Sequence, residues 1–349
     1  MSDFAVENAP YAPQFAPPNQ IYRARQTGMD MNLTNSSSHL NYKSIGDSWP
    51  VHLQLILLIG FIFLGTLLGS FAVWLFGQEW GYDLPSVLAT FNEHSDRSTR
   101  RFIRWSIFIN HLCTFLLPAL ATAWVLFRAQ WPWALKVHRP PHVVLAGWGV
   151  LFILVSFPLA QALYWINHQM PLPEWMVHME DATNEMIKAL LVMETPHELL
   201  VNLLIIALVP AIGEEFIFRG LLQQTFEKMW GQGIAAIWIT ALLFSAFHMQ
   251  FEGFLPRFAL GAVLGYLFYW TRNLWIPILA HFANNAVQVL AAYYFRELVV
   301  ELEPESAEPF TWPSSLASLA LVLLIGHHIH RLVAEETSTS TSTQNHPTI

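Results

Sequence analysis

Long apolar stretches separated by short polar loops dominate the chain after residue 48. The first begins at Val51 and reads VHLQLILLIGFIFLGTLLGSFAVWLF, long enough to cross a bilayer as a helix. Seven further apolar stretches follow, at roughly residues 103–127, 142–166, 198–226, 233–250, 254–271, 276–295 and 315–333. This pattern predicts an all-α, polytopic membrane protein of about eight transmembrane helices.

Polar residues interrupt three neighbouring stretches, at 198–226, 233–250 and 276–295. They are Glu214, Glu215, Arg219, His248, His281 and Asn285. A charged side chain at the centre of a membrane helix costs about 2.5–3.5 kcal/mol on insertion scales, so such residues usually face one another or a wet cavity. We therefore expect these six residues to meet in a polar site that the helices enclose within the membrane.

The composition agrees with a membrane protein. Hydrophobic residues make up 54% of the chain and charged residues 12%, against about 25% charged residues in soluble domains. The net charge of −8 is spread over loops and leaves no basic face, which argues against a nucleic-acid partner. The partners expected instead are membrane lipid and a peptide or protein substrate.

Changes in composition divide the chain into five parts. Residues 1–48 are rich in Pro, Asn and Ser and predict a disordered or loosely packed arm. Residues 49–197 hold the first membrane helices and an amphipathic loop, and 198–295 hold the polar site. Residues 296–334 form an acidic loop and the last membrane helix, and 335–349 predict a disordered tail. Within the second part, residues 174–193 have apolar positions near helical spacing, typical of a helix lying on the membrane or over the site. A solvated connecting helix fits them equally well.

The distribution of charge predicts the topology. Two loops, 167–197 and 296–314, are acidic. Positive residues flank the alternate helix ends: Arg23, Arg25, Lys43, Arg128, Lys136, Arg139, Lys228, Arg272 and Arg331. This bias favours a multi-pass protein of the plasma membrane with both termini in the cytoplasm. Four arginines fall on the opposite side and weaken the prediction: Arg97, Arg100, Arg101 and Arg104.

Spacing indicates which polar side chains can cooperate. Residues four apart share a helix face, so Glu215 and Arg219 can form an ion pair. Glu214 is turned away from Glu215 and is free to face another helix. His281 and Asn285 are also four apart. His248 ends its stretch with Phe244 one turn before it, and Pro210 predicts a kink just before the glutamates.

A carboxylate and two imidazoles in a site of low dielectric can hold and polarise a water molecule. Glu214 would be the general base, and Asn285 could donate a hydrogen bond to the oxyanion of a tetrahedral intermediate. The same Glu214, His248 and His281 also suit a divalent, zinc-like ion, with Glu214 as ligand instead of base. The sequence leaves both mechanisms open.

Three motifs occur in order on successive apolar stretches. EEFIFR at 214–219 fits EExxxR, FSAFH at 244–248 fits FxxxH, and HFANN at 281–285 fits HxxxN. Together they resemble the CPBP family of intramembrane endopeptidases, which includes type II CAAX prenyl proteases, bacteriocin-processing proteins and lysostaphin-resistance-protein-A-like proteins. The resemblance covers residues 198–295. It implies that Glu214 and His248 activate water, that His281 and Asn285 complete the site, and that Glu215, Arg219 and Phe244 support it. It also implies membrane-associated peptide substrates, either lipid-modified CAAX-type peptides or bacteriocin- and signal-peptide-like ones.

Other interpretations compete with catalysis. A catalytically silent scaffold or immunity factor on the same fold would keep these residues for packing, as ion pairs and interhelical hydrogen bonds. An ion-coupled transporter would need broken helices in two related halves, whereas only 198–226 is interrupted by Pro and Gly. Outside the motifs, Asn110 and His111 could support the site from behind its central residues, although a structural role is favoured. His327, His328 and His330 suggest a metal site, but a cluster at the membrane interface is the favoured interpretation.

Overall fold

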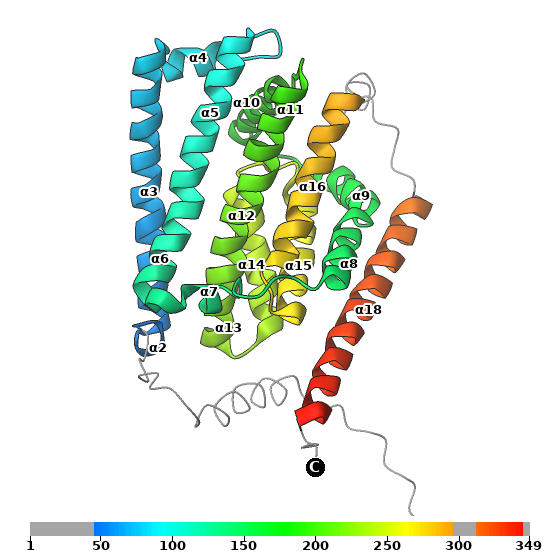
Figure 1. Ribbon diagram of the computed structural model, residues 1–349. Coiled ribbons are helices and arrows are strands. Elements are labelled where there is room, and N and C mark those ends of the chain that lie inside the picture. The colour runs from blue at the N-terminus through cyan, green and yellow to red at the C-terminus, as the bar shows by residue number, and fades with distance from the viewer. Residues whose placement is uncertain (1–44, 296–311, 345–349) are drawn as a thin grey trace, which may run out of the picture. The chain divides into compact units, whose positions relative to one another are not determined.

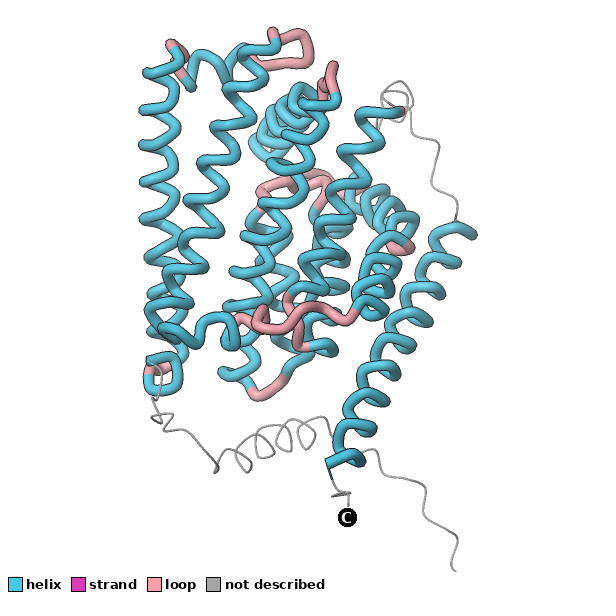
Figure 2. The backbone as a smooth tube through the Cα atoms, in the orientation of Figure 1, coloured by secondary structure: helices cyan, strands magenta, loops and turns pink. Residues whose placement is uncertain are grey.

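The computed structural model describes residues 45–295 and 312–344, and within these ranges every regular element is a helix (Figures 1 and 2). This confirms the all-α prediction. The expected N-terminal arm and most of the acidic loop at 296–311 lie outside the described residues. The last helix, α18 (Trp312–Gln344), continues past residue 335, where the sequence predicted a disordered tail.

Five helical segments are long and apolar enough to cross a membrane. They are Val51–Trp80, Arg97–Ala134, Val143–His168, Pro196–Trp230 and Trp312–Glu336. The predicted count of eight is therefore not confirmed. Three of the predicted spans are represented by shorter or less apolar helices: α14 (Gly233–Phe247), α15 (Phe254–Thr271) and α16 (Trp275–Tyr294). These three pack around the segment Pro196–Trp230.

Helix α3 (Val51–Trp80) packs through a face of small residues. Its buried positions include Gly65, Gly69 and Gly77, which approach α5 (Arg97–His111), the π-helix η1 (Leu112–Leu116) and α6 (Leu117–Phe127). A Cβ atom added at Gly65 would lie 2.0 Å from the backbone oxygen of Cys113. Small residues allow this approach, as is common where membrane helices meet. The opposite face exposes large apolar side chains, which lipid would cover.

The segment Pro196–Trp230 is the central helix of the bundle. It consists of α11 (Pro196–Asn202), η3 (Leu203–Leu208), α12 (Val209–Glu215), η4 (Phe216–Gln223) and α13 (Gln224–Trp230), where η3 and η4 are π-helical. Of its most apolar stretch, 56% is buried inside the protein, against 17% for α3. Pro210 lies in the first turn of α12, directly after η3. The interruption predicted there is thus a change of helix type, which wide π-turns accommodate.

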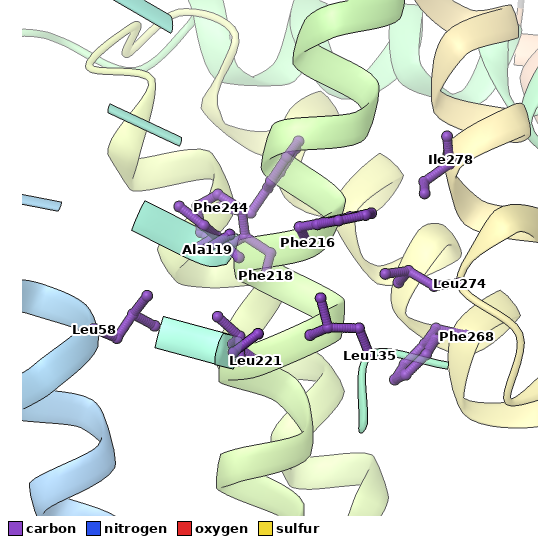
Figure 3. Packing of buried hydrophobic residues seen from close by; sticks show 12 residues of the cluster. Leu58, Ala119, Leu135, Phe216, Phe218, Leu221, Phe244, Phe268, Leu274 and Ile278 are labelled. Carbon is purple, nitrogen blue, oxygen red and sulfur yellow. The ribbon is translucent and has the colours of Figure 1, made fainter. Parts of the chain in front are cut away.

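The main apolar core surrounds η4. Phe216, Phe218 and Leu221 pack with residues of α3, α6, α14, α15 and α16 (Figure 3). Phe244 of α14 lies in this core, with its ring edge-on to Phe218 at 5.1 Å between centroids. The core therefore fixes the helix that carries His248 against the helix that carries both glutamates.

Helix α10 (Glu174–Leu190) covers the bundle next to the loop that follows His248. Glu180 is buried, and its carboxylate accepts hydrogen bonds from the backbone amides of Phe251 (2.6 Å) and Glu252 (3.3 Å). Asn167 of α9 (Phe157–His168) holds the same loop, donating to Phe251 O and accepting from Leu255 N. The amphipathic segment predicted at 174–193 is thus a helix docked on the protein.

An ion network joins α5 to the start of α11. Arg104 pairs with Glu198 at 3.1 Å and donates to the carbonyls of Leu190 and Val192, while Arg100 pairs with Glu194. Arg97 also approaches Glu198, at 3.5 Å. Three of the four arginines that disagreed with the charge bias therefore have acidic partners in the structure.

The remaining helices are short or peripheral. They are α2 (Ile45–Ser48), α4 (Leu84–Thr90), η2 (Arg128–Gln130), α7 (Trp131–Ala134) and α8 (Val143–Leu154). Helices α8 and α9 together make one membrane span, and α18 packs against both.

Candidate active site

Three helices bring four of the predicted polar residues together. Glu214 and Glu215 end α12, His248 follows the last residue of α14, and His281 lies on α16. Helix α12 packs against α16 and η1, and α14 packs against η4. These four side chains therefore meet between the helices.

The Glu214 carboxylate is the centre of the site. Its Oε2 atom lies 3.9 Å from Nε2 of His248 and 3.9 Å from Nε2 of His281. Its Oε1 atom lies 4.0 Å from Nε2 of His111. These separations are too long for direct hydrogen bonds, but a single water molecule can bridge such a gap. Glu214 is only 6% exposed, so its charge lies in a protected environment.

A hydrogen bond at Nδ1 fixes the ring orientation of both motif histidines, His248 and His281. Nδ1 of His248 lies 2.7 Å from the carbonyl oxygen of Phe244, which can only accept, so this nitrogen carries the proton. Nδ1 of His281 donates in the same way to Oε1 of Glu215, at 2.8 Å. In the neutral rings Nε2 is then an acceptor. Two acceptor nitrogens facing a carboxylate oxygen require a proton-bearing or cationic species between them.

Glu215 and Arg219 form the ion pair that their spacing predicted. Oε1 of Glu215 lies 2.7 Å from Nη1 of Arg219, and both side chains are fully buried. Nη2 of Arg219 donates to the carbonyl of Gly261 on α15 at 2.7 Å, and its guanidinium lies over the Phe244 ring at 4.7 Å. The pair joins three helices and also orients His281.

The Phe244 ring packs against both motif histidines, His248 and His281. Its ring is 4.9 Å from the His248 ring and 5.8 Å from the His281 ring, centroid to centroid. Its carbonyl holds His248. Phe244 thus contacts both histidines, and the supporting role that the motif implied for it stays a prediction.

Asn285 is held away from the carboxylate. Its amide nitrogen donates to the carbonyl of Ile206 at 3.3 Å, and its amide oxygen accepts from Asn284 at 2.9 Å. Pro210, four residues after Ile206, has no N–H to donate to that carbonyl. Asn285 therefore supplies a hydrogen bond that proline cannot, and the described contacts do not bring it to Glu214.

His111 belongs to none of the three motifs, and the sequence favoured a structural role for it over support of the site. It nonetheless lies beside Glu214, stacked on Phe115 with 4.4 Å between ring centroids. The one signal in the sequence was an ionisable residue within a membrane span. Its neighbour Asn110 is exposed.

The C-terminal histidines do not join the site. His328 packs edge-on against Trp148, and His330 against Trp270. The two rings thus pack on tryptophans of α8 and α15.

The donor set Glu214, His248 and His281 has the chemistry that zinc prefers. The spacing is a poorer match, because among the described residues no group of three or more His, Cys, Asp or Glu side chains is placed to hold a metal ion. We therefore derive the chemistry from the carboxylate and the imidazoles alone.

Comparison with known proteins identifies this same region. Residues 196–287 match the family described as type II CAAX prenyl endopeptidase Rce1-like. The uncharacterised protein YpbD of Bacillus subtilis (strain 168) is 33% identical over 96 residues, which cover 26% of this chain and 43% of YpbD. The chain thus spans less than half of the length of that relative. No solved structure matches the chain significantly.

Proposed function

We propose, from the membership of residues 196–287 in the type II CAAX prenyl endopeptidase Rce1-like family, that this protein is an intramembrane endopeptidase. The observation that carries the proposal is the convergence of His248 and His281 on one oxygen of the buried Glu214. Carboxylates and imidazoles arranged in this way suit general acid–base hydrolysis. The substrates we propose are membrane-associated peptides, including lipid-modified CAAX-type ones. We place the protein in the plasma membrane with both termini in the cytoplasm.

The reaction begins with a water molecule between Glu214 and His248. Glu214 takes one proton from this water, and Nε2 of His248 accepts a hydrogen bond from the other. The water oxygen adds to the peptide carbonyl carbon, and the carbonyl oxygen becomes an oxyanion. We assign the support of this oxyanion to His281 and to the second N–H of the Asn285 amide, whose first N–H is donated to Ile206. When the C–N bond breaks, Glu214 returns its proton to the leaving nitrogen. The products are a carboxylic acid and an amine.

Substitution of the three central residues tests the proposal. In purified protein, Glu214→Ala, His248→Ala and His281→Ala should each lower peptide hydrolysis by about 100-fold or more, because general acid–base groups contribute on that order. Asp181→Ala, on the exposed face of α10, should leave the rate unchanged. Full activity in one of the three variants would remove that residue from the mechanism.

Comparing cells that express the wild-type and the Glu214→Ala protein distinguishes an enzyme from a non-catalytic scaffold. An enzyme loses both its cleaved membrane peptides and its cellular effect when Glu214 is replaced. A scaffold keeps its effect. Comparing membrane peptides from wild-type and Glu214→Ala cells would also identify the natural substrate.

Chelation tests the metal-free reaction. In the proposed reaction Glu214 itself takes the proton from water, so dialysis against EDTA and 1,10-phenanthroline should leave the rate unchanged. A loss of activity that zinc restores would contradict this and assign Glu214, His248 and His281 as ligands.

A further inference from the structure

His111 occupies a prepared position beside the carboxylate. It is the last residue of α5, directly before the π-helix η1, and its ring stacks on Phe115 of η1 with an interplanar angle of 14°. Gly213 lies opposite, where a Cβ atom would come 3.4 Å from Nε2 of His111. The stack and the π-turn therefore hold the ring against the end of α12. π-Turns inside helices often mark functional sites.

The Nε2 atom of His111 makes no hydrogen bond to the described residues. Nε2 is buried and has no hydrogen-bond partner among the described residues, and it lies 4.0 Å from Oε1 of Glu214. A buried polar atom without a hydrogen-bond partner destabilises the folded protein. A bridging water, or a small movement of either side chain, would satisfy Nε2 on the Glu214 carboxylate.

The two oxygens of Glu214 face different partners. Oε2 faces His248 and His281, where the reacting water is proposed, and Oε1 faces His111. An Nε2–H group on His111 that donates to Oε1 would stop the carboxylate from turning and would keep Oε2 on the water.

We infer that His111 is a positioning residue for Glu214, donating a hydrogen bond from Nε2–H to Oε1 directly or through one water. The inference rests on the proposed endopeptidase activity for its catalytic consequence. The hydrogen bond itself exists in the resting protein and can be measured without substrate.

Kinetics of two substitutions test the consequence. His111→Phe keeps the ring stack on Phe115 and removes the donor, so kcat should fall by about 10- to 100-fold with little change in KM, the range expected when a positioning contact is lost. His111→Gln restores an N–H donor at a similar reach and should recover most of that loss. Cys113→Ala, in the same π-turn but facing α3, serves as the matched control with wild-type kinetics.

Wild-type kcat in His111→Phe would overturn the inference. A purely structural role would instead lower the thermal stability of His111→Phe and His111→Gln alike, with no recovery of kcat by glutamine, and that result would also overturn it.

Nitrogen-15 NMR of histidine-labelled protein tests the hydrogen bond independently. The His111 signal is assigned by its loss in His111→Phe. We expect a protonated Nε2 whose chemical shift changes in Glu214→Gln. An unprotonated Nε2, or an Nε2 chemical shift that is the same in wild type and Glu214→Gln, would refute the inference. This outcome does not depend on peptidase activity. An inactive wild type with the expected spectrum would refute the proposed function alone.

Discussion

At the scale of single residues, two adjacent carboxylates have opposite surroundings. Glu215 is fully buried and bound by Arg219 and His281, whereas Glu214 faces three imidazole nitrogens across gaps of 3.9–4.0 Å. A carboxylate such as Glu215, held through Oε1 by an arginine and a histidine, is suited to a structural role. A carboxylate that is protected but not directly bonded is suited to exchanging protons with water.

Replacing glutamate by the isosteric glutamine should therefore affect stability at Glu215 and activity at Glu214. Glu215→Gln leaves the buried Arg219 without its charge partner, and breaking a buried pair typically costs about 3–5 kcal/mol. We expect a lower yield of folded protein and a lower melting temperature in detergent. Glu214→Gln should remove activity but leave yield and melting temperature near wild type. Equal losses of stability in both variants would contradict this division of roles.

At the scale of elements, π-helices accompany the functional residues. His111 precedes η1, Ile206 lies in η3, and Arg219 lies in η4. Pro210 itself predicted a kink just before the glutamates. In the structure the π-helix η3 ends two residues before Pro210, and Asn285 donates a hydrogen bond to the Ile206 carbonyl, to which Pro210 has no N–H to donate. Asn285 thereby links the central helix to α16.

The glycine face of α3 provides a second prediction at this scale. Gly65→Ala would place a Cβ atom 2.0 Å from the Cys113 carbonyl oxygen, so α3 must move away from η1. Overpacking of this kind typically costs about 1–3 kcal/mol. Gly60→Ala meets no atom within 4 Å and should be neutral or slightly stabilising, because alanine favours helix more than glycine. Thermal unfolding in detergent compares the two. A Gly65→Ala protein as stable as Gly60→Ala would show that α3 does not pack as described.

At the scale of the whole described bundle, burial separates a lipid-facing shell from a central helix. Helix α3 and the segment Pro196–Trp230 have similar apolar sequences, yet the central segment is far more buried. Helix α10 and the loop at residues 135–142 lie at opposite ends of the bundle (Figure 1). They should therefore face opposite sides of the membrane.

Labelling of single cysteines tests this orientation. In a Cys113→Ala background, Asp181→Cys on α10 and Arg139→Cys in the loop are both exposed. A maleimide that cannot cross membranes should label Asp181→Cys in intact cells, and Arg139→Cys only after permeabilisation, as the charge bias predicts. The reverse pattern would invert the topology, and labelling of both positions in intact cells would contradict a membrane-spanning bundle.

The sequence by itself determined the helical class, the membrane setting and the core of the site. Hydropathy and four-residue spacing are local properties of the chain, so Glu214, Glu215, Arg219, His248 and His281 could be identified without coordinates. The count of eight membrane helices was less secure, because apolar content does not distinguish helices that face lipid from helices buried in protein.

Only the tertiary structure decided which partners come from distant helices. His111 reaches Glu214 because α5 and η1 pack against α12, and Glu180 holds the loop after His248 because α10 docks there. Such contacts depend on how helices cross, and no spacing within one helix encodes them. Asn285 likewise shares a face with His281 by sequence, but in the structure its amide donates to the Ile206 carbonyl of the central helix, a carbonyl to which Pro210 has no N–H to donate.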